Sequence, residues 1–270
     1  MGNPTNNGPL GTASNSPRID TGTLARTCKT PPCSTGHAFS LAKTSKDIDA
    51  LAMFDLENAV IWVNDALLAE IKRTYKNKRH LKDIHIQTLV HEFTHVLQYE
   101  DIFKKHKSRG ARAAAMVQRR ADKAMNSTED EFVKYVLNFE GNAEYQAQLV
   151  SLELTHAFSK SQGHGGFSRQ VRRSISKEKA LLWYRENKKG YADNARKTYR
   201  KIRQAAVKHG GSKGVAEASA RKEKETYTML PVSKFKSAFP TKNSPKLSTL
   251  VDKMDRFDIV VVVGLKRSRK

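Results

Sequence analysis

The chain has 270 residues, of which 38% are hydrophobic, enough for one catalytic domain with a substantial core and flexible ends. Its apolar runs are all shorter than the stretch of about eighteen residues that a membrane-spanning helix needs, so we expect no membrane span. The net charge of +22, from 49 Lys and Arg against 27 Asp and Glu, attracts nucleic acid, acidic membrane surfaces or acidic proteins without determining the fold.

The composition of residues 1–38 predicts a disordered leader. They are rich in Asn, Thr, Gly, Ser and Pro, and they have too few large apolar side chains to offset the entropy lost on ordering. No apolar core follows a basic start, so the general secretory pathway is not indicated. Translocated bacterial effectors often carry such leaders, so a secretion signal and a plain tail both stay open. Cys28 and Cys33 lie here, with only His37 nearby as a further ligand, and therefore read as incidental thiols.

Residues 39–160 have the patterning of a folded core. Residues 58–64 predict a strand, and residues 66–75 predict a helix. A longer helix is predicted over residues 84–103, with Asp83 as its N-cap. Two more helices are expected, over residues 111–125 and 132–154, the second starting at a variant of the capping box formed by Ser127 and Asp130. The pattern predicts an α+β fold that is mostly helical and has a small sheet.

Residues 161–270 are expected to form a basic, largely helical part that completes the domain. A loop rich in Gly, Ser and His occupies residues 161–168, and a basic helical region follows over residues 170–206. Gly210 and Gly211 then break the helical pattern. The apolar run 257–263 predicts a further strand.

The segment His91-Glu92-Phe93-Thr94-His95 predicts a catalytic metal site. On a helix, residues four apart lie about 40° around the axis and one turn along, so both imidazoles face one ion. Glu92 can then act as general base on a metal-bound water, whose pKa zinc lowers towards about 7. The alternative is a pair of helical histidines held by ordinary hydrogen bonds.

Two nearby residues are poor candidates for the third ligand. Asp101 follows His95 by six residues, but Gln98 stands where a turn would be needed, so a continuing helix points Asp101 about 240° away. His106 returns to the correct face, yet it lies about 16 Å further along the axis. The third ligand must therefore come from another segment.

The segment Glu140-Gly141-Asn142-Ala143-Glu144-Tyr145 resembles the E-G-x-A-x-Y element of gluzincins, the zincins with a glutamate ligand. The resemblance implies a zincin-like fold with one catalytic Zn²⁺ held by His91, His95 and Glu140. It also implies that Glu144 stands behind a ligand histidine and orients it. In that family the small residues of the element let its helix approach the H-E-x-x-H helix closely. The alternative is that both glutamates are surface carboxylates of an amphipathic helix.

The longer run His91–Gln98 is similar to the H-E-x-T-H-V-x-Q signature of metallopeptidase domains in secreted bacterial toxins and effectors. Zinc-protease effectors of type III secretion systems share the plan of a disordered leader and a compact gluzincin-like domain. The resemblance covers roughly residues 55–155. It implies a zinc-dependent endopeptidase that a bacterium secretes or translocates into a host or competitor cell, with a protein substrate and with secretion machinery or a chaperone as partners. The other expected location is the cytoplasm.

Arg196 and Tyr199 form an R-x-x-Y pair that resembles the one in clostridial neurotoxin proteases. The resemblance implies that Tyr199 stabilises the transition state. Other side chains compete for this role: Tyr184, Tyr191 and His156. We expect the substrate backbone to add to an edge strand, for which Val60–Val63 is the candidate.

The basic second half supports two competing hypotheses. Residues 171–230 hold seventeen Lys and Arg against six Asp and Glu, and aromatic residues interleave with the charges. Such a mixture can bind nucleic acid through phosphate contacts and stacking, or the aromatics can pack in the core while the cations face water. The alternatives to a free endopeptidase are therefore a nucleic-acid-associated metallopeptidase and a nucleic-acid-binding protein with an incidental H-E-x-x-H. The short basic run Lys266–Lys270 could also serve as a nuclear-localisation patch.

Overall fold

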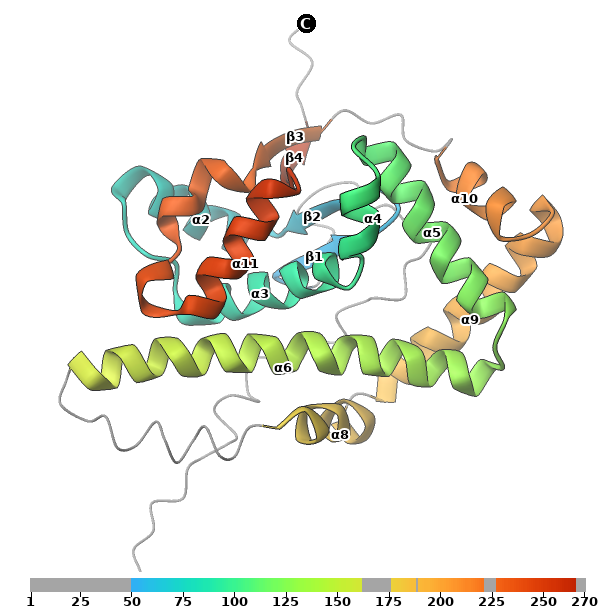
Figure 1. The fold of residues 1–270 in the computed structure, drawn as a ribbon, viewed down its shortest axis with the longest axis horizontal. Helices are drawn as coiled ribbons and strands as arrows, with labels where there is room; N and C mark the ends of the chain where they lie inside the picture. Colours follow the sequence, from blue (N-terminus) through green and yellow to red (C-terminus); the bar gives the residue numbers. More distant parts are fainter. Residues whose placement is uncertain (1–49, 162–175, 188, 221–226, 266–270) are drawn as a thin grey trace, which may run out of the picture. The chain divides into compact units, whose positions relative to one another are not determined.

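The computed structural model describes residues 50–161, 176–187, 189–220 and 227–265, which combine a small sheet with helices (Figure 1). All of these residues belong to the second of two compact units of the chain, Pro32–Lys270. The expected leader, the two cysteines, the loop 162–168 and the run Lys266–Lys270 lie outside the described residues. Most described residues are helical, and together with the mixed sheet they give the α+β class that the sequence predicts.

The sheet has four strands in the order β1-β2-β4-β3, namely β1 (Ala52–Asp55), β2 (Val60–Val63), β4 (Val260–Leu265) and β3 (Tyr227–Pro231). β2 pairs antiparallel with β1 and parallel with β4, and β3 pairs antiparallel with β4. The expectation that Val60–Val63 is an edge strand is therefore wrong. All four of its residues are buried, as in a strand covered on both faces, and the edges are formed by β1 and β3 instead.

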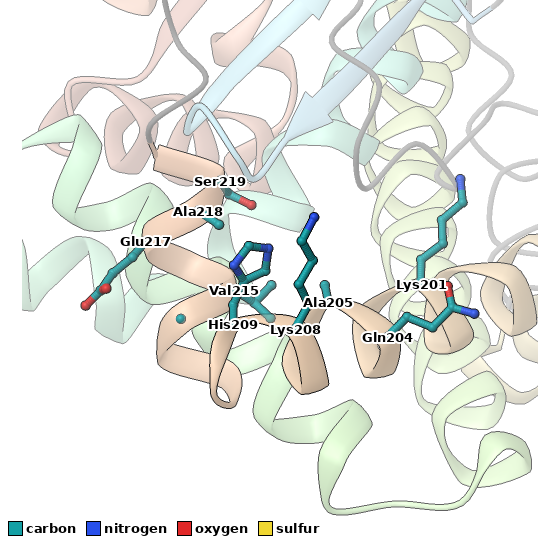
Figure 2. A pocket seen from close by; sticks show the side chains of 10 residues that line it. Lys201, Gln204, Ala205, Lys208, His209, Val215, Glu217, Ala218 and Ser219 are labelled. Carbon is teal, nitrogen blue, oxygen red and sulfur yellow. The ribbon is translucent and has the colours of Figure 1, made fainter.

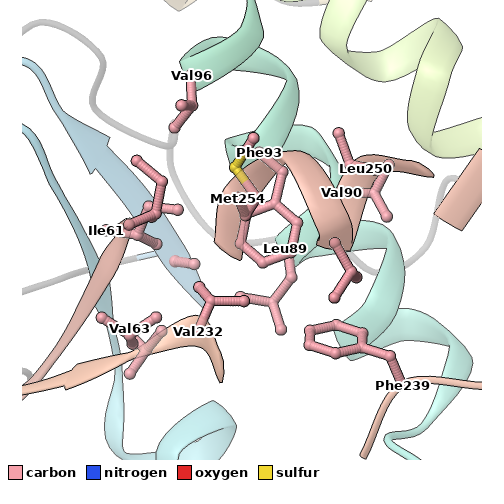
Figure 3. Close-up of a cluster of buried hydrophobic side chains, with 14 of the residues drawn as sticks. Ile61, Val63, Leu89, Val90, Phe93, Val96, Val232, Phe239, Leu250 and Met254 are labelled. Carbon is pink, nitrogen blue, oxygen red and sulfur yellow. The ribbon is translucent and has the colours of Figure 1, made fainter. Parts of the chain in front are cut away.

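The first hydrophobic core lies between the sheet and three helices, α2 (Asp65–Asn77), α3 (Asp83–Leu97) and α11 (Pro245–Arg256). Figure 3 shows how Leu89 and Phe93 of α3 face Ile61 of the sheet and Met254 of α11. Two short 3-10 helices, η3 (Val232–Ala238) and η4 (Thr241–Asn243), lead into α11. Because α3 is buried along this apolar face, its opposite face is free to meet another element.

The ends of α3 differ from the sequence prediction. The N-cap is Lys82, and Asp83 is the first helical residue, where a carboxylate still interacts favourably with the helix dipole. The helix ends at Leu97, and a separate α4 (Glu100–Lys105) follows. At the junction the Tyr99 ring packs against Phe54 and Phe139, tertiary contacts that the local pattern cannot reveal.

A second core joins α5 (Arg109–Met125), α6 (Glu129–Ser161), α9 (Lys189–His209) and α10 (Ser212–Ala220), and α8 (Lys177–Asn187) also packs on α6. α6 begins at a capping box formed by Thr128 and Glu131, not by Ser127 and Asp130. The Thr128 N–H donates to Glu131 Oε2 at 2.8 Å, and the Glu131 N–H donates back to Thr128 Oγ1 at 3.3 Å.

α6 is shared by the two cores. Its first turns, including Phe132 and Val136, pack in the second core, and its later turns, including Ala147 and Leu154, pack in the first. Glu140 lies between these two stretches. Within the described part of the chain, no helix has both the length and the apolar character needed to cross a membrane.

Candidate metal centre

The two predicted motifs lie on α3 and α6, which run side by side in opposite directions (Figure 1). Polar contacts mark the antiparallel register. Along α3 toward its C-terminus, Gln87 donates to Ser151, His91 meets Glu144, and His95 meets Glu140. As the residue number rises along α3, the number of the contacting residue on α6 falls. The sheet packs on one side of α3, so the histidines project towards α6.

Three side chains converge on one point between the helices. Glu140 Oε2 lies 3.3 Å from His91 Nε2 and 3.5 Å from His95 Nε2. One ligand atom from each of the three residues lies within 4.8 Å of the other two. Zinc ligands sit at about 2.0–2.1 Å in a tetrahedron, which puts neighbouring ligand atoms about 3.3 Å apart. The separations from Glu140 to the histidines fit such an ion.

His95 Nε2 gives a second test of that fit. It is buried and has no hydrogen-bond partner among the described residues, although the Glu140 carboxylate is close. Buried polar atoms are otherwise almost always satisfied, so an orphaned nitrogen in this position needs an explanation. A metal ion bound by His91, His95 and Glu140 would provide it, and two imidazoles with one carboxylate form a donor set found in catalytic zinc sites.

Gln98 fixes which nitrogen of His95 carries the proton. Its Nε2 donates to the Phe139 carbonyl at 2.9 Å, and its Oε1 lies 2.9 Å from His95 Nδ1. Because the amide oxygen can only accept, Nδ1 must donate, and Nε2 is left with the lone pair that a metal needs. The sequence suggested no such role for Gln98. Its one signal was the spacing of three residues from His95, which places both side chains on one helix face.

Glu144 stands on the far side of His91. Its Oε2 lies 3.7 Å from His91 Nδ1, whereas Glu140 faces Nε2. Gln148, one turn further along α6, donates to Glu144 Oε1 at 3.1 Å and holds the carboxylate. Of the two glutamates, Glu140 is therefore placed to be the ligand, and Glu144 is placed to orient His91.

The electrostatics of the cluster favour an ionised Glu140. Its side chain is buried, and burial alone would raise its pKa. The two histidines outweigh this effect, so the pKa of Glu140 falls well below its usual range. For His91 the effect of burial is the opposite, because burial of an imidazole lowers its pKa. Hydrogen bonding to Glu140 and Glu144 outweighs this, so the pKa of His91 is raised well above its usual value.

Glu92 is buried beside the cluster and is tied to the edge strand. The Phe54 N–H of β1 donates to Glu92 Oε2 at 2.7 Å. Burial raises the pKa of Glu92, although the charges of His91 and His95 and the Phe54 hydrogen bond oppose the shift. A carboxylate with a raised pKa next to a metal site is suited to accepting and returning a proton.

None of the other predicted side chains that the structure describes reaches this cluster. The Tyr199 hydroxyl donates to the Ser127 carbonyl at 3.1 Å, and its ring packs on Phe132 in the second core. Tyr191 is buried in the same core. Asp101 pairs with Arg119 instead of pointing at the histidines, as expected. The side chain of Tyr184 lies outside the described residues.

Gly141 serves a contact different from the one that the resemblance implies. A Cβ at this position would lie 2.5 Å from Leu181 Cδ2 and 3.1 Å from Leu181 Cα. The small residue therefore lets α8 approach α6, on a side of α6 away from α3 (Figure 1).

Comparison of the chain with protein-family models, with curated proteins and with solved structures found no match.

Proposed function

We propose that this chain is a zinc-dependent metallopeptidase with a centre of the gluzincin type. One observation carries the proposal: Glu140 Oε2 lies 3.3 and 3.5 Å from the Nε2 atoms of His91 and His95, with Glu92 adjacent. A closed structural site would offer four protein ligands, whereas the described residues bring three together and so leave a position for water or substrate. The spacing of the ligands supports zinc, although other divalent metals accept similar donors.

The proposed chemistry is hydrolysis of a peptide bond. Zinc at this site would lower the pKa of a bound water and polarise the scissile carbonyl. Glu92 takes the proton of the attacking water at Oε1, because the Phe54 N–H holds Oε2. The same carboxylate then delivers the proton to the amine nitrogen as the peptide bond breaks. Gln98 faces Nδ1 of His95, and Glu144 faces Nδ1 of His91. The lone pair of each imidazole is therefore kept on Nε2, the atom that would bind the metal.

We place the substrate along β1, not along β2. Asn64 N–H donates to Leu51 O, and bonding alternates along an antiparallel pair, so the N–H and C=O of Ala52 and the C=O of Phe54 are left for a partner at the free edge, while the Phe54 N–H is bound to Glu92. An extended peptide can add to such an edge through main-chain hydrogen bonds. Because Phe54 also contacts Glu92, a peptide bound there would lie next to the general base.

The test compares new protein N-termini in lysates treated with wild type and with Glu92→Gln. Glu92→Gln keeps the zinc ligands and removes the base, so we expect it to retain about one zinc per chain and to lose about 10²- to 10⁴-fold in cleavage. Glu186→Gln, an exposed carboxylate on α8, is the matched control and should cleave like wild type. Identical N-termini for wild type and Glu92→Gln, or wild-type protein without bound metal, would refute the proposal.

Secretion or translocation by a bacterium, and action in a host or competitor cell, stay predictions. They rest on the composition of residues 1–38 and on the H-E-x-T-H-V-x-Q resemblance.

A further inference from the structure

A groove of about 760 Å³ lies between α9 and α10, in the basic half of the chain. The two helices are joined by Gly210 and Gly211, whose φ values of 73° and 101° suit glycine. α10 approaches the end of α9 very closely, since a Cβ on Gly214 would lie 1.7 Å from the His209 carbonyl oxygen. The groove is thus a built feature of the α9–α10 hairpin.

The cations of α9 differ in whether they have partners within the fold. Arg196 and Arg200 form ion pairs with Glu129, and Arg203 donates to backbone carbonyls of α5, so these arginines already have partners within the protein. Lys201 and Lys208 instead line the groove, and within the described residues neither has an ion-pair partner. Figure 2 shows both lysines rising from the same side of α9, while Glu217 of α10 points away from them.

A buried hydroxyl also lines the groove. Ser219 of α10 is 8% exposed, and its Oγ has no hydrogen-bond partner among the described residues. A buried donor without a partner costs free energy unless a ligand or water satisfies it. The Gln204 side chain, an amide donor, lies on the same face of α9 as the lysines. The groove therefore offers two unpaired ammonium groups and two neutral donors.

We propose that the groove between α9 and α10 binds the phosphodiester backbone of nucleic acid. Phosphate oxygens take hydrogen bonds from lysine, glutamine and serine side chains, and such contacts are independent of sequence. Lys201 and Lys208 are seven residues apart and lie about 10 Å from each other along the axis of α9. Phosphates of one duplex strand are spaced about 3.4 Å along the helix axis, so the two lysines span about three of them. A single small anion would use only one lysine.

The test measures binding of the full chain to a fluorescent 20-base-pair DNA by anisotropy between about 50 and 200 mM salt. The double variant Lys201→Gln/Lys208→Gln should bind about tenfold to hundredfold more weakly at 0.1 M salt, and its salt slope should fall by about two. Ser219→Ala should weaken binding by about threefold to tenfold with an unchanged slope, since it removes a donor and no charge.

The matched control is Lys72→Gln/Lys76→Gln, which removes the same charge from the exposed face of α2. It should bind within about threefold of wild type. Equal losses in the two double variants would show general electrostatic attraction and overturn the proposal. So would wild-type binding by Ser219→Ala, or polyglutamate binding with the same dependence on Lys201 and Lys208. Peptidase activity is not part of the readout, so failure here would leave the proposed hydrolysis untouched.

Discussion

Gln98 couples the two helices of the candidate metal centre through a single side chain. Its amide binds His95 of α3 at one end and the Phe139 carbonyl of α6 at the other. Phe139 directly precedes Glu140. Its ring stacks on the imidazole of His95, with 5.7 Å between the two ring centroids. A change at Gln98 therefore affects both the tautomer of one ligand and the helix that carries another, without removing either ligand.

We predict that Gln98→Ala weakens zinc binding by about 10- to 100-fold, the loss typical of removing a group that orients a ligand. The reason is that His95 Nδ1–H loses its acceptor, so the ring and its tautomer are no longer fixed. Competition titration against a chelator measures the dissociation constant.

The control is Gln87→Ala, which removes another glutamine contact between α3 and α6, to Ser151, away from the ligands. We expect its zinc affinity to stay within about threefold of wild type. An equal loss in the two variants would assign the effect to helix packing in general.

At the level of elements, the contact between α6 and α8 depends on Gly141. In Gly141→Ala the new methyl group would meet the Leu181 backbone at 3.1 Å as well as its mobile side chain, so α8 must shift. Overpacking of this kind costs about 1–3 kcal/mol, against about 1 kcal/mol gained from the better helix former. We therefore predict a net loss of up to about 2 kcal/mol in the free energy of unfolding, measured by urea denaturation.

Gly110→Ala on α5 provides the comparison for this substitution. A Cβ there would have nothing within 4 Å, so only the helix propensity changes. Its free energy of unfolding should be equal to that of wild type or higher by up to about 1 kcal/mol. If Gly141→Ala were stabilised like Gly110→Ala, α8 would not pack closely on Gly141.

Sequence patterns predicted the elements whose signals are local. The helices around His91 and Glu140 have clear apolar periodicity, and the strand at Val60–Val63 is a β-branched run. β1 was missed because its four residues, ending at Asp55, are too few to show alternation. The assignment of β2 to the edge was wrong because local sequence does not show which strands pair. β2 is an inner strand because it pairs with β4, about 200 residues later in the chain.

The candidate site was predictable to the extent that one helix determines it. The spacing of His91 and His95 follows from helical geometry, and Glu140 came from a resemblance between motifs. Gln98 and the Phe54–Glu92 hydrogen bond were not predictable, because each joins segments whose distance only the fold sets. The end of α3 at Leu97 was not predictable either, because no Gly or Pro follows it to mark the end of a helix.

In the molecule as a whole, the candidate metal centre lies where the two hydrophobic cores meet. α3 belongs to the first core, whereas α6 contributes to both, and the His91–Glu140 and His95–Glu140 contacts join them. An ion held by His91, His95 and Glu140 would cross-link α3 to α6 at this junction. Metal binding should therefore stabilise the fold as well as provide chemistry.

We predict that removing zinc lowers the melting temperature. A ligand that binds only the folded state at about 1,000 times its dissociation constant contributes about 4 kcal/mol, or about 8–16 °C for a chain of this size. Differential scanning fluorimetry with added zinc or with a chelator measures the shift.

His91→Ala should abolish the response to zinc, because only two of the three ligands would be left to hold the ion. His106→Ala should keep it, since His106 lies at the end of α4 and outside the ligand group. A response that survives in His91→Ala, or disappears in His106→Ala, would mean that the stabilising ion binds elsewhere.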